Sequence, residues 1–99
     1  MTKRYKVNLT QLAQNDLAKI YYYIAADSIS NATNFVLELE KMIYSLESFP
    51  DRQPLIAENE LFDTDYRQLI YKKCRVIYRI SEKTVFILRV VHGSRLLAF

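Results

Sequence analysis

Basic side chains concentrated in the last third of this 99-residue chain are the residues best suited to chemistry. From Tyr66 to Arg95 there are eight Lys and Arg residues and a single acidic one, so this segment carries +7 and the rest of the chain −4. A guanidinium presents a planar fork of donors that fits carboxylates and phosphates alike. The segment therefore predicts a surface for an anionic partner. Its candidate anion- or partner-binding residues are the five arginines Arg67, Arg75, Arg79, Arg89 and Arg95.

Two further residues bear on reaction chemistry. His92 is the single histidine, and its ordinary pKa of about 6.5 would suit a general base. It could equally be a strand-end residue bonded to backbone, and the arginines could equally form a set of surface salt bridges. Cys74 is the single cysteine, and we expect it to be a small buried or turn residue. With one His and one Cys, we expect no metal site, no disulfide scaffold and no cofactor.

Composition bounds the class of protein. The chain is 51% apolar with one Gly and two Pro, which excludes low-complexity and disordered classes and supplies one modest core. We therefore expect a single domain over residues 1–99. No apolar run approaches the length of a membrane span, and no signal peptide is evident. The sequence favours a cytoplasmic domain that does not bind membranes.

The first half of the chain predicts a strand and two helices. Residues 4–9 alternate, with Tyr5, Val7 and Leu9 on one side. Thr10 can cap a helix that runs to about residue 27, and Ser30 can cap a second that ends near Ser48. Of the tyrosines at 21–23, one must point outward. The helices bury two apolar stripes: Ala13, Leu17, Ile20 and Ile24 in the first, and Ala32, Phe35, Val36, Leu39, Met42, Ile43 and Leu46 in the second.

The second half predicts a connection and three strands. Residues 50–64 contain both prolines and several acidic residues, which indicates an irregular, mostly exposed connection. Strands are predicted over 66–71, 75–81 and 84–92, with a tight turn at 81–83. The order β-α-α-β-β-β predicts an α+β fold in which a helical hairpin packs on one face of a small, mainly antiparallel sheet.

Alternation along the strands assigns side chains to faces. Over 75–81 it groups Arg75 and Arg79 with Ile77. Over 84–92 it groups Arg89 with Val85, Ile87 and Val91, against Phe86, Leu88, Val90 and His92. We therefore expect the arginines on the face that the helices leave open.

These motifs, in this order, resemble the RelE/ParE superfamily of bacterial toxins from type II toxin–antitoxin systems. The resemblance rests on Asp16-Leu17 through Tyr23-Ile24, Ala32–Phe35, Leu46 to Pro50, Tyr66–Leu69, Cys74–Arg79 and Ile87–Arg95. It implies a partner antitoxin that neutralises the toxin, with a possible toxin–antitoxin hetero-oligomer. RelE-like members cut ribosome-bound mRNA, whereas ParE-like members poison DNA gyrase.

The resemblance implies only part of a nuclease site. Arg75 and Arg95 match arginines of the RelE-like nucleases, and Arg67 stands where one catalytic Lys would be. Leu69 replaces a second Lys, and no Tyr follows the last strand. If the nuclease alternative holds, the catalytic candidates are Arg67, Arg75, His92 and Arg95.

The leading hypothesis is therefore a ParE-like toxin that inhibits gyrase by binding and is neutralised by an acidic antitoxin. The first alternative is a RelE-like mRNA endoribonuclease. The second is an inactive relative that only binds the antitoxin.

Overall fold

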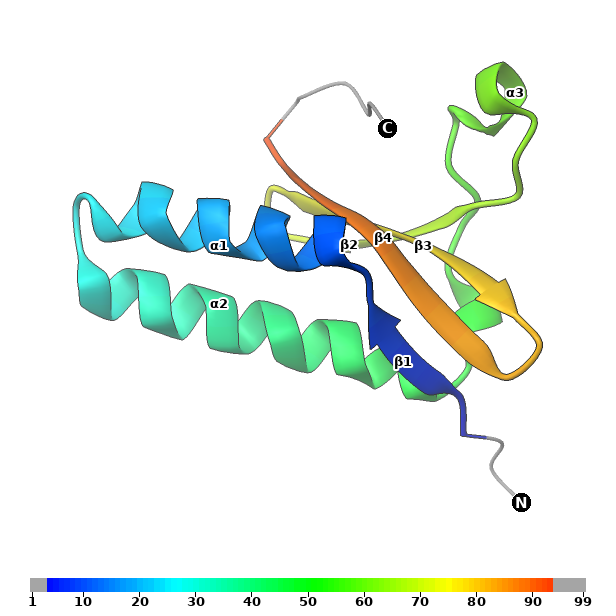
Figure 1. Cartoon of the computed structure of the whole chain (residues 1–99), viewed down its shortest axis with the longest axis horizontal. Helices are drawn as coiled ribbons and strands as arrows, with labels where there is room; N and C mark the ends of the chain where they lie inside the picture. Colours follow the sequence, from blue (N-terminus) through cyan, green and yellow to red (C-terminus); the bar gives the residue numbers. More distant parts are fainter. Residues whose placement is uncertain (1–3, 94–99) are drawn as a thin grey trace.

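A four-stranded sheet carries a helical hairpin on one face in the computed structural model, which describes residues 4–93 (Figure 1). The predicted order of strand, two helices and three strands is confirmed. The elements are β1 (Lys6–Leu9), α1 (Gln11–Ala25), α2 (Ile29–Tyr44), the 3₁₀ turns η1 (Ser45–Glu47) and η2 (Pro50–Arg52), α3 (Asn59–Phe62), β2 (Arg67–Tyr71), β3 (Cys74–Ser81) and β4 (Thr84–His92).

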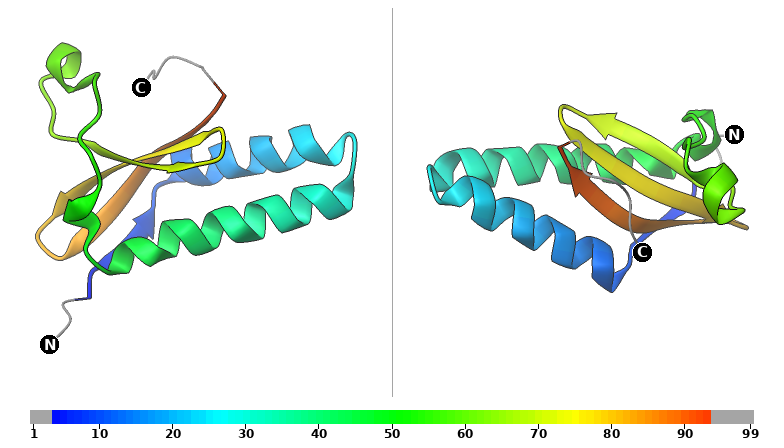
Figure 2. Two further views of the ribbon diagram at one scale, coloured as in Figure 1. Left: turned by 180° about the vertical axis from the view of Figure 1, so that it is seen from behind. Right: turned by 90° about the horizontal axis from the view of Figure 1, so that it is seen from above.

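The sheet is mainly antiparallel, with one parallel edge. Its strand order is β1-β4-β3-β2, and only the β1–β4 pair is parallel. Two-residue turns join β2 to β3 and β3 to β4, and the first residue of each, Lys72 and Glu82, has a positive φ of 52° and 56°. The view from above in Figure 2 shows both long helices on the same side of the sheet.

The main core lies between the helices and the sheet. The predicted inward residues Leu17 and Leu39 are confirmed as buried, at 9% and 0% exposure. They pack with one face of β2, β3 and β4, and Tyr5, Val7 and Leu9 of the first strand pack against the same cluster, as predicted. Burial of such a set is the main force that holds a small domain together.

Side-chain caps set the starts of both helices. Thr10 is the N-cap of α1, as predicted, and its hydroxyl accepts from the Ala13 backbone N–H at 3.3 Å. The prediction of Ser30 as the second cap was wrong, because Ser28 is the N-cap of α2 and accepts from the Asn31 backbone N–H at 3.1 Å. Ser28 caps the helix in the way predicted for Ser30, two positions later. The second helix therefore begins earlier, and the break between the helices is shorter than predicted.

A β-bulge in β4 overturns part of the predicted alternation. Tyr78 pairs with Ile87 and Ile77 pairs with Arg89, so Leu88 is an extra residue in the ladder. An extra residue reverses the facing of everything that follows it. Val90 therefore lies in the helix-side core with Val85 and Ile87, whereas Val91 faces the opposite side. The shared facing predicted for Arg89, Val85 and Ile87 was wrong.

The connection between α2 and β2 is more ordered than predicted. It contains η2 and α3, and Ile56 is 3% exposed in a second apolar cluster with Ile77 and Val91. This cluster lies on the sheet face away from the helices, so that face is partly covered. The segment is mostly exposed, as predicted, but it is not irregular throughout, and Ile56 anchors it to β3 and β4.

Two tyrosines of the 21–23 run point outward, one more than predicted. Tyr22 and Tyr23 are 72% and 70% exposed, and only Tyr21 is half-buried. Three successive residues span nearly a full helical turn, so one apolar stripe accommodates just one of them. Among residues 4–93, no helix has both the length and the apolar character needed to span a bilayer.

Candidate functional site

Arg75, the candidate catalytic arginine of β3, is already bound to a carboxylate. Its two terminal nitrogens donate to Glu58 Oε2 and Oε1 at 2.8 and 2.9 Å, and its Nε donates to Gln68 Oε1 at 2.8 Å. Hydrogen bonding to Arg75 lowers the pKa of Glu58, and hydrogen bonding to Glu58 raises the pKa of Arg75. The Arg75 guanidinium, which would have to bind a phosphate, is thus already bound to side chains of the same protein. Its raised pKa also makes Arg75 unsuited to act as a base.

Arg89, which we expected on the open face, instead binds α1 at the edge of the sheet. Its Nε and a terminal nitrogen donate to the two carboxylate oxygens of Asp16 at 2.8 and 3.0 Å. Hydrogen bonding to Asp16 raises the pKa of Arg89. Asp16 itself is 7% exposed. By register Arg89 does lie on the open face, opposite Ile77, but the buried carboxylate on α1 draws its guanidinium toward the helix.

The other two candidate arginines in the described region differ in how far their guanidinium groups are already bound. Arg67 pairs with Tyr78, so it lies on the helix side, and its guanidinium donates to the Gln53 carbonyl at 2.6 Å. Arg79 stacks on the Phe86 ring at 4.5 Å. Within residues 4–93, Arg79 forms no ion pair with a carboxylate. Among the candidate arginines within residues 4–93, it is the one most available to an external anion.

His92 ends β4 on the helix side of the sheet. Its cross-strand partner is Cys74, a member of the helix-side core, and cross-strand partners share a face. Its ring lies 5.9 Å from the ring of Tyr23 and 6.4 Å from that of Phe35. His92 thus sits among aromatic rings from both long helices.

The four nuclease candidates do not converge. Arg75 lies on the opposite face from His92, because Arg75 is next to Cys74 along β3 and neighbouring residues of a strand face opposite ways. Arg67 lies on the helix side but pairs with Tyr78, four residues from Cys74, which is about 13 Å along the strand. Arg95 is outside the described residues. The structure therefore assembles no pair of these groups around one phosphate within residues 4–93.

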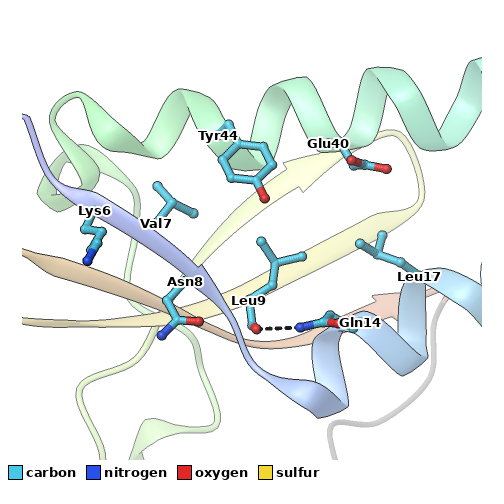
Figure 3. Close-up of a pocket in the computed structure, with 8 residues that line it drawn as sticks. All are labelled: Lys6, Val7, Asn8, Leu9, Gln14, Leu17, Glu40 and Tyr44. Carbon is cyan, nitrogen blue, oxygen red and sulfur yellow. Dashed lines mark hydrogen bonds between the residues drawn. The ribbon is translucent and has the colours of Figure 1, made fainter.

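A groove opens between β1 and α2, away from all of these residues (Figure 3). It has a volume of about 630 Å³, a floor that includes Val7, Leu9 and Leu17, and walls with Glu40 and Tyr44. The Gln14 amide donates to the Leu9 carbonyl at 3.0 Å and closes one end of the β1 edge. Its lining combines three apolar side chains with five polar or charged ones, so the groove offers a partner both apolar and polar contacts.

Two buried titratable groups in the core are not part of an evident reaction centre. Cys74 is fully buried, as predicted, and burial raises its pKa to about 11. Tyr78 donates to the Pro50 carbonyl at 2.5 Å, and burial raises its pKa. Within the described range 4–93, no three His, Cys, Asp or Glu residues gather as metal ligands would.

Sequence reasoning missed the partners of the arginines. Asp16 was recognised only as part of a motif, and Glu58 only as one acid in a connection taken to be solvated. The one signal that could have singled out Asp16 is its place in the helical pattern, one residue before the buried Leu17 and three after the buried Ala13. Nothing local marks Glu58, because its partner Arg75 is 17 residues away.

Comparison with known proteins confirms the resemblance inferred from the motifs. The model of the family described as ParE toxin of type II toxin-antitoxin system, parDE, matches residues 7–97. A chain from the chromosomal ParDE system of P. aeruginosa has a TM-score of 0.75 and 18% identity, covering 94% of this chain and 100% of that one, which shows the shared fold. A chain from the toxin–antitoxin complex RelBE2 of Mycobacterium tuberculosis has a TM-score of 0.68 and 25% identity, covering 93% and 94%. No curated protein sequence matches the chain significantly.

Proposed function

Because the chain belongs to the family of ParE toxins of type II toxin–antitoxin systems, we propose that it acts in the cytoplasm by binding DNA gyrase and inhibiting it. The observation that carries this proposal is the separation of Arg75 and His92 onto opposite faces of the sheet. RNA cleavage needs proton-transfer and charge-stabilising groups around a single phosphate. Inhibition by binding has no such requirement.

The proposed gyrase-binding edge is the end of β4 and the chain after it, residues 89–99. The basic residue Arg95 supports this choice, whereas Arg89, at the start of the edge, is already bound to Asp16. Arg79, on the neighbouring strand and without a carboxylate partner in residues 4–93, extends the same cationic surface. Charge of this kind steers encounter with an anionic surface.

Purified toxin and gyrase test the proposal directly. We expect the toxin to block supercoiling of relaxed plasmid or to trap cleaved DNA, and to leave mRNA on purified ribosomes uncut. Arg95→Ala should weaken this inhibition more than Arg75→Ala does, once both variants are compared at equal folded fraction. A toxin that leaves gyrase activity unchanged at saturating concentration would refute the proposal.

A RelE-like mRNA endoribonuclease is the second candidate, favoured by the likeness to the RelBE2 toxin–antitoxin complex. In that case position-specific cuts should appear in ribosome-bound mRNA. Arg75→Ala and Arg95→Ala should then each lower the single-turnover rate by about 10²-fold or more, as removal of one charge-stabilising donor does. Activity in neither assay, with antitoxin binding intact, is the result expected of an inactive antitoxin-binding relative.

The proposed partner that neutralises the toxin is an acidic antitoxin, with the groove of Figure 3 as one contact. Exposed cations without carboxylate partners in residues 4–93 attract such a partner, and the groove floor gives it an apolar anchor. Buried apolar anchors hold a complex together, whereas charge mainly speeds its formation.

A further inference from the structure

Asp16 is the one buried charged side chain in residues 4–93, and the function proposed above does not use it. Besides its two bonds from Arg89, its Oδ2 accepts the backbone N–H of Val90 at 2.9 Å. These bonds join α1 to β4 across 74 residues of sequence. Burying a carboxylate is costly unless it is paired and hydrogen-bonded, and these three bonds offset that cost for Asp16.

Beyond the end of β1, hydrogen bonds from Thr10, the N-cap of α1, and from Asp16 of α1 reach the backbone of β4. β1 ends at Leu9, opposite Ile87, so the outer edge of β4 has no strand beside it after that point. Thr10 Oγ1 then donates to the Ile87 carbonyl at 2.7 Å, and Asp16 accepts from Val90. The side chains of Thr10 and Asp16 thus bind backbone groups of β4 that a longer β1 would have paired.

The bulged residue Leu88 lies between these two anchors. Because of it, Val90 and His92 face the helices and Val91 faces away. With no bulge, every residue after Ile87 would face the other way. His92 would then leave the rings of Tyr23 and Phe35.

We propose that Asp16 is a positioning residue for the described part of the gyrase-binding edge, residues 89–93: its carboxylate holds the bulge at Leu88 and so sets the face on which the side chains from Arg89 to His92 emerge. The inference rests on the proposed function for its effect on gyrase. The positioning itself is measurable without gyrase, on the toxin alone.

The discriminating variant is Asp16→Asn, which keeps the side chain's size. An amide keeps one acceptor oxygen and puts an NH2 group in place of the other, so it cannot receive all three bonds and turns a donor toward at least one N–H of Arg89 or Val90. The matched control is Asp27→Asn, which makes the same change of charge at an exposed site just after α1. A second control, Leu17→Ala, weakens the core while leaving the carboxylate in place.

Four measurements are made on each folded toxin: amide hydrogen exchange at Val90, the nuclear Overhauser contact between the rings of His92 and Tyr23, the half-inhibitory concentration for gyrase, and the affinity for the antitoxin. For Asp16→Asn we expect Val90 exchange to accelerate and the ring contact to weaken. The half-inhibitory concentration should rise by about tenfold, with antitoxin affinity within about threefold of wild type, since the groove does not involve β4.

Two outcomes would overturn the inference. One is a Val90 amide and a ring contact as in wild type. The other is a loss of gyrase inhibition that marks a purely structural role. That is a loss no greater than the loss caused by Leu17→Ala at equal folded fraction, or a loss accompanied by an equal loss of antitoxin affinity. If wild-type toxin leaves gyrase untouched, the proposed function fails, and the Val90 and His92 signals still decide whether Asp16 positions the end of β4.

Discussion

Replacing Arg75 by alanine should destabilise the fold more than it impairs any activity of the folded toxin. The change removes both hydrogen bonds from Arg75 to Glu58 and the one to Gln68. It also leaves the Glu58 carboxylate, whose side chain is 18% exposed, without its cation. The nuclease hypothesis predicts the opposite pattern, in which the fold survives and the chemistry is lost.

The exposure and geometry of the Arg75–Glu58 ion pair set the size of the expected loss of stability. Exposed ion pairs contribute about 0–1 kcal/mol, and breaking a fully buried one costs about 3–5 kcal/mol. At 21% and 18% side-chain exposure, with a two-pronged contact, the Arg75–Glu58 pair falls between these limits. We expect Arg75→Ala to lower the free energy of unfolding by about 2–3 kcal/mol. Arg79→Ala, on the same strand and face but without a carboxylate partner in residues 4–93, should cost less than about 1 kcal/mol.

Urea unfolding of wild type, Arg75→Ala, Glu58→Gln and the double variant gives the coupling energy, for which we expect about 1–2 kcal/mol at pH 7. The pKa of Glu58 is lower in the folded state. Its contribution is therefore fully present above its unfolded pKa of about 4.3 and is lost as the pH falls through the folded value. A coupling energy near zero at pH 7, or one that grows on acidification, would refute this reasoning.

Three other substitutions or conditions test separate parts of the structure. Leu39→Ala should cost about 2–5 kcal/mol because Leu39 is fully buried; an unchanged melting temperature would contradict the helix facing. The Cys74 thiol, buried and with a pKa of about 11, should react with a thiol reagent at pH 8 only as fast as the protein opens, so adding denaturant below the unfolding midpoint should accelerate labelling. The association rate with the antitoxin should fall as salt is raised from about 50 to 500 mM, because screening removes the attraction of the exposed cations; stopped-flow fluorescence would show a flat rate if charge plays no part.

Local patterns predicted the elements, because periodicity and caps act over a few residues. Thr10 was identified as a cap from its place before an apolar stripe, and the structure confirms it. Ser28 and Ser30 offered the same chemistry two positions apart, so the sequence alone did not separate them. Strand bounds were predicted to within a residue or two, since β-branched and aromatic runs mark them clearly.

Long-range contacts explain where the predicted side-chain facing and the predicted connection differ from the structure. Simple alternation through 84–92 assumes an unbroken ladder, and the bulge at Leu88 is held by Asp16, a residue more than 70 positions earlier. The connection was judged by its acids and prolines, although one apolar residue, Ile56, was enough to fix it to the sheet. In each case a single distant partner outweighed the local pattern.

Counting charges along the sequence overstates how much cationic surface this toxin can offer. Two of the basic residues in the +7 segment, Arg75 and Arg89, are bound to Glu58 and Asp16 from the acidic part of the chain. The cations of this segment that stay exposed within residues 4–93 are a smaller set at the turns and on β3: Lys72, Lys73, Lys83 and the partly exposed Arg79, whereas Arg67 is bound to the Gln53 carbonyl. An anionic partner therefore meets cations at the two ends of the hairpin strands, with one guanidinium between them. The paired arginines, in contrast, hold the connection and α1 against the sheet, so their loss should be read first as a loss of structure.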